Sequence, residues 1–177
     1  MTRPVPSSSS PALPVARLLL RILIALNWLW GAAIVVLLVA LPHEQWIMRA
    51  FKLSPSPDAD RVIMALRAIA VLGLAVIPLN YVFLQRLLAI VETVRAGDPF
   101  VAANAQRLKT MGWALLGLQL LGIVIGAIAR AVSTPAYPVD IDAGFSINGW
   151  LAVLLTFLLA RVFAEGAHMR EDLEGTV

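Results

Sequence analysis

Four long stretches of this chain carry no charged side chain, and apolar residues dominate each of them. They are Ile22–Pro42, Ala68–Gln85, Thr110–Ala129 and Ala143–Ala160. A helix of about 20 apolar residues crosses a hydrocarbon core of about 30 Å. The stretches are continuously apolar rather than alternating, which indicates membrane helices and not the strands of a barrel. The pattern predicts an all-α integral membrane four-helix bundle, with spans at about residues 18–41, 62–85, 110–130 and 144–163.

Composition agrees with this fold class. Hydrophobic residues make up 60% of the chain and charged residues 14%, whereas soluble domains are about 45–50% apolar. Short connections leave room for a single domain, residues 16–177, after a Ser/Pro-rich segment, residues 1–15, that is expected to be disordered. The first apolar stretch is longer than the core of a signal peptide. The candidate cleavage site at its end, Leu38-Val39-Ala40, lacks the small residue that is needed at its first position. We therefore expect it to remain as a span.

The absence of cysteine and the distribution of charge exclude several other classes of site and partner. The chain has no cysteine, which excludes disulfides, thiolate metal sites and cysteine nucleophiles. The net charge is +3, but the positive residues are scattered along the chain rather than gathered in one patch. They are typical of the flanks of membrane helices, so no direct nucleic-acid partner is expected, and the partner that is expected first is the lipid bilayer.

The positive residues also predict the orientation of the chain. With the N-terminus in the cytoplasm, the inner side holds nine of them: Arg3, Arg17, Arg21, Arg86, Arg95, Arg107, Lys109, Arg161 and Arg170. The outer side holds five: Arg49, Lys52, Arg61, Arg67 and Arg130. Because inner loops carry the excess of positive charge, both termini are expected in the cytoplasm.

The two outer connections show weaker patterns. His43–Phe51 places apolar residues on one helical face, which predicts a short amphipathic helix on the membrane surface. Asp58 or Asp60 is expected to cap the second span. Asp140 and Asp142 are interpreted as solvated loop acids, because two carboxylates alone make a weak calcium site.

The segment between the second and third spans has the most regular polar pattern in the chain. Apolar residues continue at helical spacing beyond Gln85, so the second helix is expected to run from about Asp60 to Ala96. Gly97 suits the stop of that helix. Asp98 is expected to be the N-cap of the next helix, with Pro99 at its first position. Both helices then exceed the hydrocarbon core by about 20 Å, which predicts a cytoplasmic helical hairpin. The hairpin is interpreted either as a packing stub or as a docking surface for a cytosolic protein.

Polar and small residues inside the spans predict helix contacts. Asn27 and Asn80 are expected to meet each other or a backbone carbonyl, because an amide facing lipid is costly. Gln119, Gly122 and Gly126 share one face of the third span. That face is expected either to pack within the bundle or to form the seam of a homodimer.

The chain offers little for catalysis or transport. No acidic residue or histidine lies within the uncharged stretches, and the two histidines, His43 and His168, fall on opposite sides of the membrane. Glu165, His168, Glu171 and Asp172 are interpreted as a solvated helix end. No catalytic, cofactor or metal site is therefore predicted, and the chain is not expected to be an enzyme.

The hairpin and the tail carry a family resemblance. Gly97-Asp98-Pro99-Phe100-Val101, followed by Asn104, Arg107 and Leu108, resembles the signature of the prokaryotic membrane family "domain of unknown function 2975" (DUF 2975). The tail agrees, with Glu171-Asp172-Leu173 and the final Gly175-Thr176-Val177. The resemblance covers about residue 16 to the C-terminus. It implies a four-helix membrane protein with no assigned activity, and association of such families with a small helix-turn-helix regulator.

Together these patterns predict a multi-pass protein of a prokaryotic inner membrane that acts as a non-enzymatic partner or regulator. Its docking hairpin is expected to comprise Arg95, Gly97, Asp98, Pro99, Phe100, Asn104 and Arg107. Two alternatives remain open: a small-molecule transporter or permease component, and a structural homo-oligomer.

Overall fold

The computed structural model describes residues 12–40, 57–135, 139, 141 and 144–174. Four helices account for most of them: α1 (Ala12–Ala40), α3 (Pro57–Arg95), α4 (Ala102–Val132) and α5 (Ile147–Glu174). Each contains a segment that is long and apolar enough to cross a membrane. The prediction of an all-α chain with four such helices is therefore confirmed. The expected amphipathic helix His43–Phe51 and the loop acids Asp140 and Asp142 lie outside the described residues.

Two helices begin earlier than the sequence pattern predicts. Helix α1 begins at Ala12, within the segment 1–15 that was expected to be disordered. Helix α3 begins at Pro57, where proline suits the first turn because no N–H is needed there. Asp58 and Asp60 therefore lie inside the helix, and the expectation that one of them is its N-cap is wrong.

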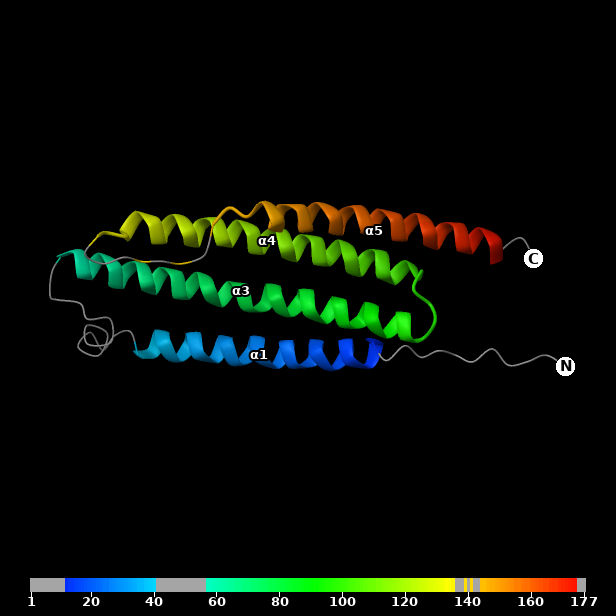
Figure 1. The fold of residues 1–177 in the computed structure, drawn as a ribbon, viewed down its shortest axis with the longest axis horizontal. Coiled ribbons are helices and arrows are strands. Elements are labelled where there is room, and N and C mark those ends of the chain that lie inside the picture. The colour runs from blue at the N-terminus through cyan, green and yellow to red at the C-terminus, as the bar shows by residue number, and fades with distance from the viewer. Residues whose placement is uncertain (1–11, 41–56, 136–138, 140, 142–143, 175–177) are drawn as a thin grey trace.

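The four helices lie side by side in chain order and form an open row (Figure 1). Helix α1 packs on α3, α3 packs on α4, and α4 packs on α5, while α1 and α5 lie at the two edges of the row (Figure 1). The edge helices consequently expose large apolar side chains, such as Leu29 and Leu154. In a membrane these surfaces face lipid chains, which are as apolar as the side chains themselves.

Glycines allow a large side chain of the neighbouring helix to approach each helix closely. A Cβ atom at Gly112 would lie 2.9 Å from the Phe157 ring, and a Cβ at Gly117 would lie 3.1 Å from Leu79. Between α1 and α3, a Cβ at Gly31 would lie 3.2 Å from Ile77. Without a hydrophobic driving force between helices in lipid, such close packing supplies much of the attraction.

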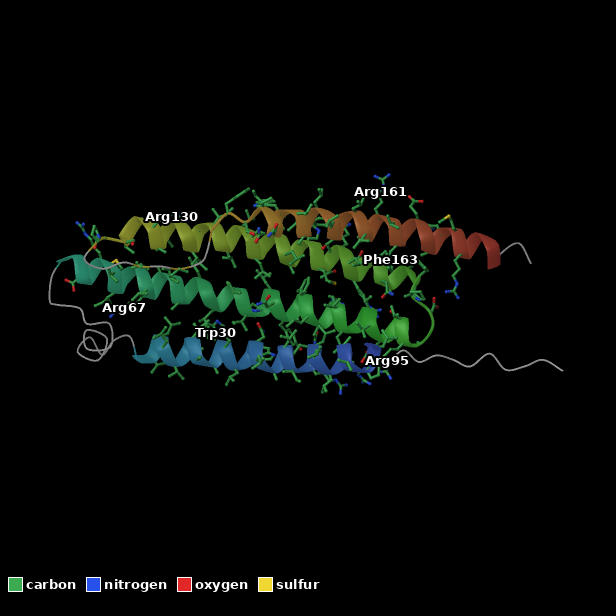
Figure 2. All side chains as sticks on the ribbon, viewed as in Figure 1. Trp30, Arg67, Arg95, Arg130, Arg161 and Phe163 are labelled. Atoms are coloured by element: carbon green, nitrogen blue, oxygen red, sulfur yellow. The ribbon has the colours of Figure 1, made fainter. Side chains whose placement is uncertain are left out.

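These contacts set the register between the helices. Lys109 lies eight residues before Gly117, and Arg86 lies seven residues after Leu79. At 1.5 Å per residue, the two cations are level to within about 2 Å. Arg67 and Arg130, at the other ends of the same two uncharged stretches, are level by the same argument and lie toward the same end of the molecule in Figure 2.

The edge helices follow the same register. Phe157 of α5 contacts Gly112 of α4. Arg161 lies four residues after Phe157, and Lys109 lies three residues before Gly112. Arg21 likewise lies ten residues before Gly31, against nine residues from Ile77 to Arg86 on α3. One exposed cation on each helix therefore lies at a common level, and we call this set the basic row: Arg21, Arg86, Lys109 and Arg161.

Helix α5 is displaced along the row toward the α3–α4 turn (Figure 1). It begins beside Gln119, near the middle of α4, where the Gln119 side chain donates a hydrogen bond to the Ser146 carbonyl at 3.2 Å. Ser146 is the N-cap of α5, because its Oγ accepts the N–H of Gly149 at 3.2 Å. The span expected from residue 144 thus starts as a helix only at Ile147. The helical part that is level with the other uncharged stretches, Ile147–Ala160, measures about 21 Å.

The fold predicts that Gly112 is intolerant of a side chain. Gly112→Ala should lower the free energy of unfolding in detergent by about 1–3 kcal/mol, because the added methyl would overlap the Phe157 ring. Gly73→Ala is the matched control: its Cβ would lie 3.5 Å from Ile34, an ordinary contact, and alanine favours the helix. Equal unfolding midpoints for the two variants would contradict the close α4–α5 packing.

Candidate functional site at the α3–α4 turn

The turn between α3 and α4 is a hydrogen-bonded helix stop. Gly97 has a φ of 86°, a backbone conformation that glycine adopts without steric cost. Its N–H donates to the Val94 carbonyl, and the Asp98 N–H donates to the Thr93 carbonyl, both at 3.1 Å. This pair of bonds is the Schellman motif. The prediction that Gly97 ends the helix is confirmed.

The start of α4 differs from the prediction. The N-cap is Val101, which has an extended backbone and no side-chain capping bond. Asp98 and Pro99 precede the helix, so the expectation that they form its cap and first position is wrong. The Asp98 carboxylate instead forms an ion pair with Arg170 of α5. The chain reverses at Gly97, and Asp98 then lies toward α5. Its carboxylate therefore pairs with the Arg170 guanidinium and not with the first backbone N–H groups of α4.

Asn104 is the polar centre of the turn and is fully buried. Its amide nitrogen donates to Thr93 Oγ1 and to the Pro99 carbonyl, each at 2.8 Å. Its Oδ1 accepts a bond of 2.7 Å from Arg107, which also reaches the Ala89 carbonyl at 3.3 Å. The side chain therefore joins α3, the turn and α4. Asn104 cannot belong to an exposed docking face, and Arg107 is half-buried in the same network.

Arg95 and Phe100 are exposed members of the expected docking set, as is Gly97 of the turn itself. Phe100 keeps 46% of its surface exposed, while its ring lies 5.3 Å from that of Phe163 and covers Gly166 of α5. Arg95 is the last residue of α3 and is exposed. Figure 2 shows Arg95 at the opposite end of the molecule from Arg67 and Arg130.

All four helices take part in this end of the molecule. Arg17 of α1 forms an ion pair of 3.4 Å with Glu92 of α3. Beneath the turn, Leu108, Met111 and Ala160 form a buried cluster with partly buried neighbours from α3 and α5. The sequence predicts a two-helix hairpin, whereas the structure has a four-helix end. We call this the protruding end, residues 12–20, 87–108 and 162–174, which extends about 13 Å beyond the basic row along α3.

Of the two asparagines in the spans, Asn27 bonds a backbone group of this chain and Asn80 lies beside it. Asn27 is buried and donates to the Ile77 carbonyl of α3 at 3.1 Å, as one of the two expected alternatives predicts. Asn80 is half-buried and lines the same hollow as Asn27, otherwise formed by carbon side chains such as Phe83.

The expected small-residue face of α4 packs within the chain. Gly126 is buried, and a Cβ at Gly122 would lie 3.7 Å from the Gly144 carbonyl. Gln119 and Gly122 line a second hollow together with Arg130, on residues different from those around Asn27. Within the described residues, no three His, Asp or Glu side chains come together as metal ligands.

This architecture is that of a polytopic helical membrane protein, with a polar turn network at one end and no metal cluster in the part of the chain described. The chain belongs to the family described as protein of unknown function (DUF2975), whose model matches residues 13–177. The family resemblance inferred from the turn sequence is thereby confirmed. No curated protein and no solved structure matches the chain.

Sequence reasoning missed several residues at this end. Thr93 and Glu92 gave no signal, because a threonine and a glutamate on a polar helix end are ordinary. Arg170 was interpreted only as an inner-side charge, and its partner Asp98 lies 72 residues away. The basic row was visible as the charges that border each uncharged stretch, but its common level needs the helix register.

The Asn104 network predicts a large loss of stability on truncation. Asn104→Ala should lower the free energy of unfolding by about 1–3 kcal/mol, because Arg107 and Thr93 lose a buried partner. Gln106→Ala, an exposed neighbour on α4, is the control. The network would have no stabilising role if the two variants unfolded at the same temperature and were cut at the turn by protease at the same rate.

The Asp98–Arg170 pair should contribute little and should respond to salt. Both side chains are more than a third exposed, and exposed pairs contribute about 0–1 kcal/mol. A double-mutant cycle with Asp98→Ala and Arg170→Ala should give a coupling energy below about 1 kcal/mol that falls on adding salt. A coupling energy of zero, with the whole loss of unfolding free energy already present in Asp98→Ala alone, would instead favour a local capping role for Asp98.

Proposed function

We propose that this chain is a non-enzymatic membrane protein whose protruding end docks a cytosolic protein. The observation that supports it most is the extension of all four helices beyond the basic row. A chain that only needed to span the bilayer would not need about nine further residues on α3. The ordered turn network keeps this end rigid, and rigid surfaces bind with less loss of conformational entropy.

The surface of the protruding end suits a protein partner. Phe100, Met169 and Arg95 are exposed there, beyond the level at which lipid chains would cover apolar side chains. Aromatic residues, methionine and arginine are enriched in the centres of protein interfaces. The chemistry favours a partner that offers apolar side chains together with carboxylates. A small helix-turn-helix regulator with an acidic docking face is the partner class we propose.

The distribution of charge supports a cytoplasmic position for this end. Four cations form the basic row, whereas Arg67 and Arg130 are the cations that border the uncharged stretches at the opposite level. Positive residues concentrate on the cytoplasmic side of membrane proteins. The proposed setting is a prokaryotic inner membrane with both termini in the cytoplasm.

The alternatives receive less support from the arrangement of the spans. A transporter needs a polar path across the membrane. The hollow around Asn27 and Asn80 is lined mainly by apolar side chains, and it shares no residue with the hollow around Gln119. A homo-oligomer joined through Gly122 and Gly126 needs an exposed glycine pair, and Gly126 is buried within the chain.

Photocrosslinking in living cells tests this proposal. A photoreactive residue at position 95 or 169 should form one adduct of the same discrete mass, with the same cytosolic protein. Probes at Leu120, an exposed residue level with the uncharged stretches, and at Arg61, at the opposite end, should not form it. Arg95→Glu should abolish the adduct from position 169, and Arg61→Glu should leave it intact.

Two outcomes would contradict the proposal. One is the absence of any discrete adduct at positions 95 and 169 while the protein is folded and inserted. The other is an identical set of adducts from Leu120, which would indicate random collision in the membrane.

A further inference from the structure

A groove of about 510 Å³ lies between α4 and α5, on the side of the row near the turn. Its floor consists of small side chains: Ala102, Ala105, Ala160, Ala164 and Ala167. Phe157 lines the groove at the end that leads into the uncharged stretches, where it also packs against Gly112. The alanines leave the space between the two helices open, since larger side chains at these positions would fill it.

The rim of this groove is positively charged. Lys109 and Arg161, the α4 and α5 members of the basic row, both line it, together with Gln106. His168 lies further out on α5 and also lines the groove. Lys109 directly precedes one uncharged stretch, and Arg161 directly follows another. The two cations are therefore placed where the hydrocarbon ends and lipid phosphates begin.

We propose that this groove binds the headgroup of an anionic phospholipid. Lys109 and Arg161 pair with the phosphate oxygens through charge-assisted hydrogen bonds, and Gln106 donates a further bond to the headgroup. The acyl chains follow the apolar surface past Phe157 and Ala160 into the bilayer. Basic recesses between membrane helices at this depth are suited to acidic lipids.

The shape of the groove favours a lipid over a free phosphate ion. It is continuous from the cations to Phe157 and Ala160, which are level with the uncharged stretches. A phosphate ion would use only the rim and leave this apolar part unoccupied. Lys109 and Arg161 are both exposed, so a lipid headgroup can reach them without any opening of the helices.

The inference is independent of the proposed docking function. It concerns the face between α4 and α5 and not the exposed Arg95 and Phe100, so either can fail without the other. A bound acidic lipid would also join α5, an edge helix that packs mainly on α4, more firmly to that neighbour.

Native mass spectrometry of the purified full chain tests the site. The protein is exchanged from detergent into equal amounts of phosphatidylglycerol and phosphatidylcholine, and the retained lipid is measured. Phosphatidylglycerol should be retained in preference. The Lys109→Gln/Arg161→Gln variant should weaken its binding about fivefold for each cation, about 30-fold for the pair. Arg21→Gln/Arg86→Gln, with the same charge change at the same level outside the groove, should weaken it less than about threefold.

A second variant guards against misfolding of the charge variant. Ala164→Leu fills the groove without changing any charge and should reduce phosphatidylglycerol retention at least about tenfold while the circular dichroism spectrum stays unchanged. Equal losses in the two charge pairs, or no preference for phosphatidylglycerol in the unmodified chain, would overturn the proposal. Displacement of the lipid by millimolar inorganic phosphate alone would also overturn it in favour of a phosphate site.

Discussion

The exclusion of charge from hydrocarbon is the constraint on which the rest of this structure depends. A lysine, arginine or aspartate at the centre of a membrane helix costs about 2.5–3.5 kcal/mol or more, so each helix places its uncharged stretch at one common level. The helix contacts then bring Arg21, Arg86, Lys109 and Arg161 into register. That register divides the molecule into a lipid-facing part, a basic row, and an end that protrudes from it.

Different forces hold the two parts of the molecule together. Within the uncharged stretches, side chains such as Phe157 and Leu79 pack over glycines, because apolar surface gains little from leaving lipid. At the protruding end, polar interactions take over: the buried Asn104 network, the Arg17–Glu92 pair and the Asp98–Arg170 pair. Both of these ion pairs and the Asn104 network lie beyond the basic row, which supports its assignment as the membrane boundary. The same boundary explains why a groove lined by cations and alanines suits a lipid headgroup.

The sequence predicts the elements of this fold better than their partners. Uncharged stretches locate the four helices, and Gly97 locates a helix stop, because both signals are local. The residues around Asp98 form a local pattern that is typical of an N-cap, so the sequence predicts a cap. Its actual partner, Arg170, lies on another helix, and no local pattern indicates that contact. Asn104 was assigned to the exposed docking face because the local sequence does not show that Thr93, Pro99 and Arg107 enclose it. The start of α5 was placed too early because the apolar stretch continues before the Ser146 cap, and apolarity alone does not distinguish helix from extended chain.

Single-cysteine labelling tests the division at the basic row most directly, because the natural chain has no cysteine. Cysteines at positions 95, 102 and 169, on the ends of α3, α4 and α5, would be treated with a membrane-impermeant maleimide in intact cells and in inverted vesicles. All three should react in inverted vesicles and remain unreacted in intact cells, while cysteines at the lipid-facing positions 29 and 154 react in neither. Reaction of position 95 and position 169 from opposite sides, or protection of all three in both preparations, would contradict the common level of α3, α4 and α5.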